Sequence, residues 1–217
     1  MATRTDPASL DREWMLRALV VLQAPRAVFA ALRDDSDEAA HARQEPVLAL
    51  LWLAGIAGIL LTPTARTLLD DPARDGLVVA VIAFLGGGFY GTFVYWLGGA
   101  LVHGASRALG GQGSYRRARH VVAFAAAPTA LSLLLVWPLG IAAFGGDVFR
   151  TGGSDSGTGG ALLYAVAFAF AVWSVALLAV GIRAVHGWTW GRSLAALAIA
   201  VAGGAAVVGL LELLTRG

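Results

Sequence analysis

The chain has 217 residues, of which 58% are hydrophobic and only 14% are charged. Soluble domains carry roughly 45–50% apolar and about 25% charged residues, so this composition excludes a soluble globular protein. The net charge of +2 gives no support to nucleic-acid binding, and the absence of cysteine excludes disulfide bonds and thiolate metal sites.

Residues 1–45 are predicted to be a cytoplasmic or interfacial amphipathic helical segment that precedes the membrane domain. Asp6 and Pro7 match a helix N-cap followed by proline at the first helical position. Such a helix either lies in the headgroup plane or packs on the cytoplasmic loops of its own domain. A second short helix is expected from Pro25, and the acidic run 34–38 is expected to be a solvated linker or an acidic helix start. Apolar side chains of the first helix recur at helical spacing, at Leu10, Trp14, Ala18, Val21 and Leu22.

Residues 46–217 are predicted to form a membrane domain that crosses the bilayer five times. About 20 helical residues span the hydrocarbon core, and backbone polar groups in lipid must bond within their own helix. Long uncharged stretches of this length predict spans at about 46–65, 76–106, 120–144, 160–182 and 193–214. The predicted fold class is therefore all-α: a polytopic integral membrane protein with five transmembrane helices, preceded by an N-terminal interfacial or cytoplasmic helical segment.

Glycine and proline predict irregularities in these spans. The second span is longer than it needs to be, and Gly86-Gly87-Gly88 indicates either a tilted or a glycine-weakened helix. The pattern Gly87-x-x-x-Gly91 lets helices approach closely, within the chain or between chains. Pro128 predicts a kink in the third span, because proline removes a backbone donor and clashes with the preceding turn. Trp137-Pro138 predicts the end of that span at an interface, and the glycine/serine-rich stretch 151–160 predicts a flexible loop.

The distribution of arginine predicts the orientation, because short cytoplasmic loops carry an excess of basic residues. On the N-terminal side of the membrane the count is nine: Arg26, Arg33, Arg43, Arg107, Arg116, Arg117, Arg119, Arg183 and Arg192. On the opposite side it is four: Arg66, Arg74, Arg150 and Arg216. The protein is therefore predicted to lie in the cell (cytoplasmic) membrane with its N-terminus in the cytoplasm and its C-terminus outside.

Ionisable groups in or near the spans are the first candidates for function. His103 and His120 lie near the cytoplasmic ends of spans two and three. They either face each other and share a metal or a proton, or bond to loop backbone as interfacial residues. Glu212 is expected to pair with Arg216 four residues on, the alternative being an ion-binding carboxylate. No H-E-x-x-H or G-x-S-x-G motif occurs, so no catalytic, cofactor-binding or metal-ligating residue is expected unless helices assemble one from His103, His120, Arg183 or Glu212.

The loop between spans two and three carries glycine and arginine. Its segment Gly110–Tyr115 superficially resembles a phosphate-binding glycine loop, but it lacks the G-x-x-x-x-G-K-[ST] pattern, so nucleotide binding is not expected. Arg116, Arg117 and Arg119 follow this segment. Juxtamembrane arginines near an anionic leaflet contribute about 1 kcal/mol each, so these three are candidate lipid or partner contacts as well as topology signals.

Three ordered features carry a family resemblance. They are the pre-membrane segment Leu22–Leu32, the glycine-rich turn Gly110–Tyr115 and the span opening Val122–Pro128. On these features the chain resembles the bacterial branch of the Ypt-interacting-protein (Yip) membrane-domain family over roughly residues 20–214. The resemblance implies a five-span domain with a cytoplasmic N-terminus. Eukaryotic relatives act in vesicle traffic and bind Rab-type GTPases, but this chain has Ala123-Phe124 where they often carry Gly-Tyr, and only Ala24-Pro25 near their Asp-Leu-x-Gly-Pro segment.

These features favour a non-enzymatic membrane protein that acts as a scaffold, a lipid-organising module or a partner-binding module, with no cofactor. Its expected partners are anionic lipid headgroups on the cytoplasmic side and a protein partner or a second copy of the chain, but no nucleic acid. The alternative is a small transporter or channel subunit, alone or as an oligomer, which Pro128, the glycine-weakened second span and His103/His120 would serve. A third hypothesis, an intramembrane enzyme, requires a converged polar cluster that the sequence does not show.

Overall fold

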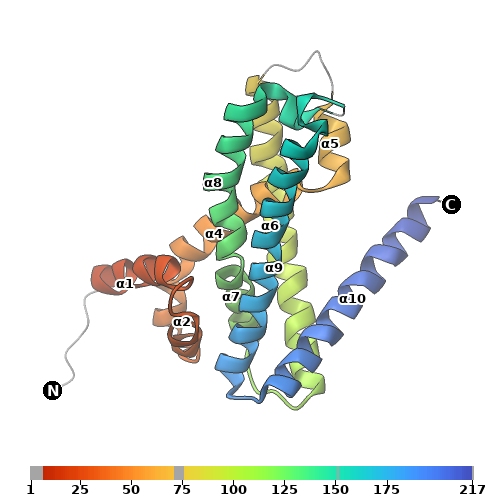
Figure 1. The fold of residues 1–217 in the computed structure, drawn as a ribbon. Coiled ribbons are helices and arrows are strands. Elements are labelled where there is room, and N and C mark those ends of the chain that lie inside the picture. Colours follow the sequence, from red (N-terminus) through yellow and green to blue (C-terminus); the bar gives the residue numbers. More distant parts are fainter. Residues whose placement is uncertain (1–6, 71–75, 151, 217) are drawn as a thin grey trace. The chain divides into compact units, whose positions relative to one another are not determined.

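The computed structural model describes residues 7–70, 76–150 and 152–216, and within these ranges it contains helices and turns but no strand. Helices begin at Pro7 and Pro25, as the sequence predicts, while Asp6 lies outside the described residues. In chain order the elements are α1 (Pro7–Val20), α2 (Pro25–Ala31), α3 (Asp37–His41), α4 (Gln44–Leu60), α5 (Pro63–Leu69), α6 (Gly76–Ala108), α7 (Tyr115–Ala125), α8 (Ala127–Phe144), the 3₁₀ turns η1 (Gly145–Phe149) and η2 (Ser154–Ser156), α9 (Thr158–His186) and α10 (Trp190–Arg216) (Figure 1).

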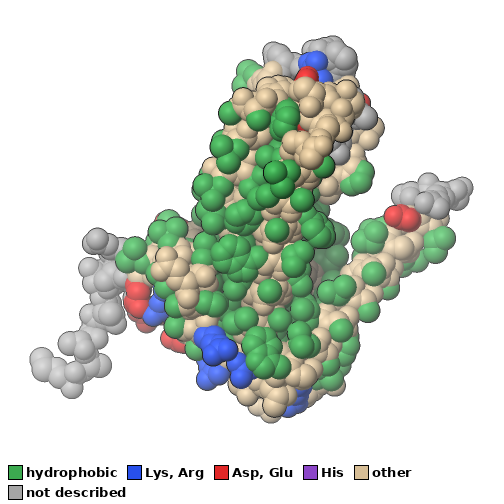
Figure 2. Space-filling view, in the orientation of Figure 1, with side chains coloured by type: hydrophobic (Ala, Val, Ile, Leu, Met, Phe, Trp, Pro, Cys, Tyr) green, Lys and Arg blue, Asp and Glu red, His purple; other side chains and the backbone are tan. Residues whose placement is uncertain are grey.

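Five helical segments of the described chain are long and apolar enough to cross a membrane: Asp37–Leu60, Gly76–Ala108, Tyr115–Phe149, Thr158–His186 and Trp190–Leu214. Hydrophobic side chains cover much of the helical surface that is visible in Figure 2. Because a soluble protein does not expose apolar surface on this scale, these side chains face lipid. The prediction of an all-α polytopic membrane protein with five transmembrane helices is confirmed.

The first span ends earlier than the sequence indicated. α4 stops at Leu60, and a separate short helix, α5, begins at Pro63. Thr62 caps α5, because its Oγ1 accepts a hydrogen bond from the backbone N–H of Ala65 at 3.2 Å. Proline at the first helical position sacrifices no hydrogen bond, so the sequence Thr-Pro starts a new helix here.

The third span is interrupted at Ala126, between α7 and α8. Pro128 lies in the first turn of α8, where its missing N–H has no intrahelical partner to lose. The predicted irregularity therefore takes the form of a break two residues before this proline. The prediction that Trp137-Pro138 ends the span is wrong, because α8 continues to Phe144 with Pro138 inside it. The Trp137 ring is packed against Phe149 and Tyr164, at centroid distances of 6.2 and 6.4 Å, which favours continuation of the helix despite one lost hydrogen bond.

The stretch predicted to be a flexible loop is largely structured. Thr151 lies outside the described residues, but Ser154–Ser156 form η2 and α9 begins at Thr158. Asp155 is buried, and the Tyr164 hydroxyl donates a hydrogen bond to its Oδ2 at 3.3 Å. A buried, bonded carboxylate fixes this segment, which glycine and serine content alone did not reveal.

The chain divides into two compact units. Unit 1 comprises Met1–Val47, Val94–Ala125 and Ala176–Gly217, and unit 2 comprises Leu48–Phe93 and Ala126–Val175. One hydrophobic cluster of unit 1 joins the adjoining parts of α6, α7, α9 and α10. From Val201 to Leu214 the side chains of α10 are largely exposed, as expected for an apolar helix in lipid. The buried residues of this unit 1 cluster are Val102, Ala105, Val122, Ala179, Ile182, Ala196, Leu197 and Ala200.

In unit 2, α4 and α6 approach each other through glycine. A Cβ atom added at Gly55 would lie 2.9 Å from the Cα of Gly91, and it would collide with the carbonyl oxygen of Gly87. The small-residue pattern in the second span therefore serves packing within the chain. Beyond this contact, one buried hydrophobic cluster of unit 2 consists of Leu60, Leu69, Trp137 and Val148.

Candidate functional site: the polar face of unit 1

An acidic segment precedes the first span and is ordered by its own hydrogen bonds. Ser36 caps α3, and its Oγ accepts a hydrogen bond from the backbone N–H of Ala39 at 3.3 Å. Asp34 Oδ1 accepts a bond from the backbone N–H of Ser36 at 3.1 Å. This bond holds the pKa of Asp34 below its usual value. Of the two alternatives for residues 34–38, the acidic helix start is thus the one that forms.

Arg116 holds this acidic segment from the start of α7. Its Nε lies 3.1 Å from Asp35 Oδ1 and its Nη1 lies 2.7 Å from Asp37 Oδ1, while Nη2 donates to the backbone carbonyl of Asp35. Ser114, just before α7, adds a hydrogen bond to the Asp35 carboxylate. A guanidinium that bonds to one segment through three nitrogens fixes the orientation of that segment as well as its distance from the guanidinium. Arg116, a candidate lipid contact, is therefore engaged by its own chain.

Arg117 and Arg33 extend the same connection to α9. Arg117 Nη2 donates to the backbone carbonyl of Arg33 at 2.8 Å, and Arg33 Nε donates to the carbonyl of Ala184 at 2.9 Å. Ala184 lies in the last turn of α9, where carbonyl groups lack helical partners and attract positive charge. The pre-membrane segment is thus tied to the ends of two spans.

A fully buried arginine, Arg43, completes the connection. Its side chain is 0% exposed, its Nη2 donates to the backbone carbonyl of Asp34 at 2.9 Å, and its guanidinium lies 5.1 Å from the Trp14 ring. Sequence reasoning counted this residue only as a topology signal, because burial depends on the fold. We call the connected set Arg33, Asp34, Asp35, Asp37, Arg43, Ser114, Arg116 and Arg117 the polar platform.

Helix α1 packs beside the platform. Trp14 is buried, and its ring centroid lies 5.7 Å from that of Phe124 in α7. This contact agrees with the interpretation of α1 as a helix packed on its own domain. The opposite side of α1 remains apolar and accessible, since Leu16 and Leu19 are 55% and 71% exposed, which also suits a position at the membrane surface.

Arg119 differs from its two neighbours in the cluster. Its guanidinium carbon lies 3.9 Å from the Trp96 ring centroid, 4.9 Å from that of Tyr115 and 5.2 Å from that of Tyr95. Gly99 provides the space, since a Cβ there would lie 3.1 Å from the Cα of Arg119. Stacking on aromatic rings satisfies a cation without a carboxylate, so Arg119 acts in the packing of α6 against α7.

The structure gives His103 and His120 different surroundings. The His103 ring lies 5.9 Å from that of Tyr115, whereas His120 is buried and its Nδ1 has no hydrogen-bond partner among the described residues. No contact between the two histidines is present in the described part of the chain. Instead, His103 shares a small pocket with His186, which sequence reasoning set aside and which stacks on Trp188 at 4.4 Å.

The remaining candidates lie apart from the platform contacts. Arg183 packs over the Trp190 ring at 4.8 Å. Glu212 lies on the exposed C-terminal part of α10. The side chain of Arg216 lies outside the described residues, so the expected Glu212–Arg216 pair stays a prediction.

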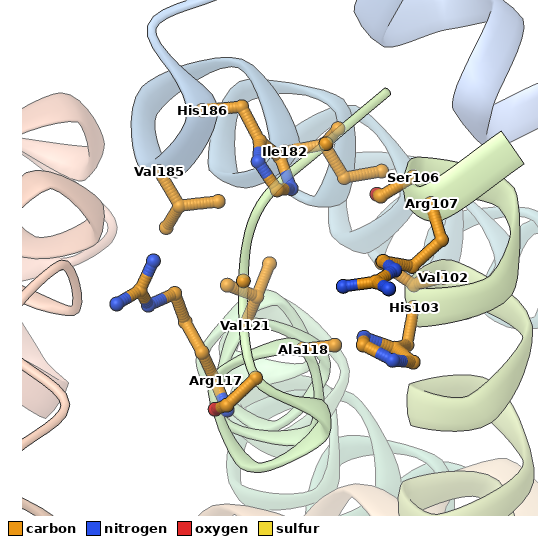
Figure 3. A pocket seen from close by; sticks show the side chains of 13 residues that line it. Val102, His103, Ser106, Arg107, Arg117, Ala118, Val121, Ile182, Val185 and His186 are labelled. Atoms are coloured by element: carbon orange, nitrogen blue, oxygen red, sulfur yellow. The ribbon is translucent and has the colours of Figure 1, made fainter. Parts of the chain in front are cut away.

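The shared pocket lies where α6 and α9 end and α7 begins (Figure 3). Side chains of His103, Ser106, Arg107, Arg117 and His186 surround it, and its volume is about 10 Å³. Gly110, with φ of +77°, turns the chain between α6 and α7 beside it. On the face shown in Figure 2, basic side chains gather near the C-terminal end of α9.

Unit 2 contains a larger and mainly apolar cavity of about 600 Å³. Hydroxyl groups of unit 2 bond locally: Ser132 donates to the carbonyl of Thr129 at 2.7 Å, and Thr129 and Ser174 hydroxyls lie 2.8 Å apart. Among the described residues, no group of three or more His, Cys, Asp or Glu side chains is placed to hold a metal ion. The cavity is lined by Ile56, Leu60, Leu69, Gly76, Val79, Ala80, Ala83, Phe84, Leu133, Trp137, Pro138, Ile141, Gly145, Gly146, Phe149 and Arg150.

Comparison with known proteins identifies the family. A family model described as the Yip1 domain matches residues 19–211, which include α2 to α9 and most of α10. No curated protein and no solved structure matches the chain. The family match agrees with the resemblance in Leu22–Leu32, Gly110–Tyr115 and Val122–Pro128, and with the five apolar spans. The chain is therefore a multi-pass membrane protein that belongs to the Yip1 domain family.

Proposed function

We propose that the protein is a non-enzymatic scaffold of the cytoplasmic membrane, which binds a protein partner and organises anionic lipid through the polar platform. The observation that carries the proposal is the three-way bonding of Arg116 to Asp35 and Asp37. This bonding joins the pre-membrane segment to the start of α7, although Asp35 and Arg116 are 81 residues apart in the chain. Such bonding presents one fixed polar surface, as a docking module requires.

The proposed orientation places the platform in the cytoplasm and the C-terminus outside. It is supported by the arginine count, because nine basic residues accompany the N-terminal side and four the other. We place the chain in the bacterial branch of the family. Ala123-Phe124 stands where eukaryotic relatives often carry Gly-Tyr, so the binding of Rab-type GTPases is not carried over.

A transporter or channel is the alternative, and it requires a polar path through the spans. The hydroxyls of Thr92 and Ser132 each donate to a backbone carbonyl of their own helix at 2.7 Å, and that of Ser193 donates to the carbonyl of Thr189, just before α10, at 2.9 Å. The cavity of unit 2 is lined mainly by apolar side chains. Neither observation supports a hydrated polar path through the spans.

Photocrosslinking from a single cysteine tests the proposal, since the chain has no cysteine of its own. Glu38 is exposed on α3 beside the platform, and Glu38→Cys carries the photoreactive maleimide in native membranes. We expect discrete protein adducts that disappear when Asp35→Asn and Arg116→Gln are added, because these changes break the platform. Ser156→Cys, exposed in η2 of unit 2, is the matched control and is expected to give no such adduct.

The scaffold proposal fails if Glu38→Cys yields only the adducts seen with Ser156→Cys. It also fails if breaking the platform leaves the adducts unchanged. Solute flux through liposomes that contain the purified chain, above the flux through protein-free liposomes, would favour the transporter alternative instead.

A further inference from the structure

The pocket between the ends of α6, α7 and α9 gathers basic side chains from three helices. His103 and Arg107 come from α6, Arg117 from α7 and His186 from α9 (Figure 3). None of the described residues that line it is acidic. The side chain of Arg107 is exposed and makes no ion pair or hydrogen bond to any described residue. The pocket therefore concentrates positive charge that its own lining does not neutralise.

Ser106 supplies an independent sign of a ligand. Its side chain is only 4% exposed, and its Oγ has no hydrogen-bond partner in the described structure. Figure 3 shows the hydroxyl directed toward the pocket. The buried Nε of Arg117 also lacks a partner, although Nη2 of the same guanidinium bonds to the Arg33 carbonyl. Buried polar groups are nearly always satisfied, so these two atoms indicate an oxygen acceptor that enters the pocket.

The dimensions of the pocket restrict the shape of that acceptor. A volume of about 10 Å³ holds roughly one water molecule, so a single oxygen atom enters and the rest of the group stays at the mouth. Gly113 lines the pocket beside two of these side chains, since a Cβ there would make ordinary contacts with His186 Cε1 at 3.4 Å and Arg117 Nη1 at 3.7 Å. Donors that converge from three helices suit an anion whose oxygens point in several directions, as those of a tetrahedral phosphate do.

We infer that this pocket binds a phosphate group, with one oxygen on Ser106 and the others on Arg107 and Arg117. The group belongs either to a phospholipid headgroup or to free inorganic phosphate, because both present the same oxygens. The pocket lies at the ends of spans, the level at which headgroups meet basic side chains. The inference deepens the proposed function, and its lipid source rests on the proposed cytoplasmic orientation of this face.

The test uses the full chain in nanodiscs of phosphatidylcholine, either alone or with added phosphatidic acid. Inorganic phosphate is titrated into the nanodiscs that contain phosphatidylcholine alone. Tryptophan fluorescence follows thermal unfolding, and Trp188 reports on the site because it stacks on His186. We expect phosphate or phosphatidic acid to raise the melting temperature of the unaltered protein. Ser106→Ala and Arg107→Gln are each expected to weaken the response about tenfold, since each removes one hydrogen bond to a charged group.

Arg26→Gln is the control, because Arg26 is exposed on α2, does not line the pocket and loses the same charge. A response to phosphate that only the pocket variants lose supports the site with free phosphate as a sufficient ligand. A response to phosphatidic acid alone, lost in the same variants, supports it with a lipid headgroup as the ligand. No response to either probe, or equal loss in Arg26→Gln, overturns the inference. Protein adducts from Glu38→Cys are then unaffected, and the partner-binding part of the proposed function stands.

Discussion

Three arginines within one turn of α7 show how side-chain partners decide the role of a residue. Arg116 bonds to Asp35 and Asp37, Arg117 bonds to the Arg33 carbonyl and lines the pocket, and Arg119 stacks on aromatic rings. Sequence reasoning treated them as one cluster with one role. The sequence did not reveal their partners. Apart from Tyr115, these partners are distant in the chain and reach the three arginines only through folding.

Arg43 is the residue whose loss should most weaken the platform. Arg43→Met keeps much of the side-chain volume but removes the hydrogen bond to the Asp34 carbonyl and the stacking on Trp14. We expect the free energy of unfolding to fall by about 2–3 kcal/mol, because partners of a buried charge are left unsatisfied. Unfolding by a denaturing detergent, followed by tryptophan fluorescence, measures the change.

Arg26→Met is the matched control for this substitution. Arg26 is exposed on α2, so its replacement is expected to change stability by no more than about 0.5 kcal/mol. Equal stability of Arg43→Met and the unaltered protein would show that the buried guanidinium does not hold the pre-membrane segment.

At the scale of elements, the spans could be predicted because composition determines them. Uncharged stretches long enough to cross a bilayer became α4, α6, the second half of α7 with α8, α9 and α10. Prolines at positions 7 and 25 began α1 and α2. The sequence did not reveal α5, which depends on a Thr62 cap inside a stretch assigned to the first span. It also misplaced the effect of Pro138, because the packing of Trp137 outweighs one lost helical hydrogen bond.

The close contact between α4 and α6 leads to a prediction about stability. A methyl group at Gly55 would meet the backbone of Gly87 and Gly91, which cannot move as a flexible side chain does. Gly55→Ala is expected to lower the free energy of unfolding by about 1–3 kcal/mol through overpacking. Denaturing-detergent titration monitored by circular dichroism provides the measurement.

Gly104→Ala in α6 is the matched control, because it changes helix propensity in the same way as Gly55→Ala without causing a close contact. Nothing lies within 4 Å of a Cβ at Gly104, so this change should leave stability unaltered or raise it by up to about 1 kcal/mol. If Gly55→Ala were as well tolerated as Gly104→Ala, the close contact between α4 and α6 would not exist in the folded protein.

For the whole molecule, the family and the five spans could be predicted from the sequence. Only some residues of the candidate site could be predicted in this way. The sequence singled out Arg117 as a candidate lipid or partner contact. It singled out the glycine turn and His103 for other roles. Ser106, Arg107 and His186 were not, because the end of α6, which carries Ser106 and Arg107, meets Arg117 of α7 and His186 of α9 only in the fold. No spacing pattern in the sequence indicates that these helix ends lie together.

The central claim is a five-span protein whose platform faces the cytoplasm, and labelling with a membrane-impermeant maleimide tests it most directly. Gln112→Cys, in the turn after α6, and Ser156→Cys, in the turn before α9, each provide one exposed thiol in a chain without cysteine. We expect intact cells to label Ser156→Cys, and Gln112→Cys to react only after the membrane is permeabilised. Labelling of Gln112→Cys in intact cells, or the same accessibility at both positions, would contradict this account.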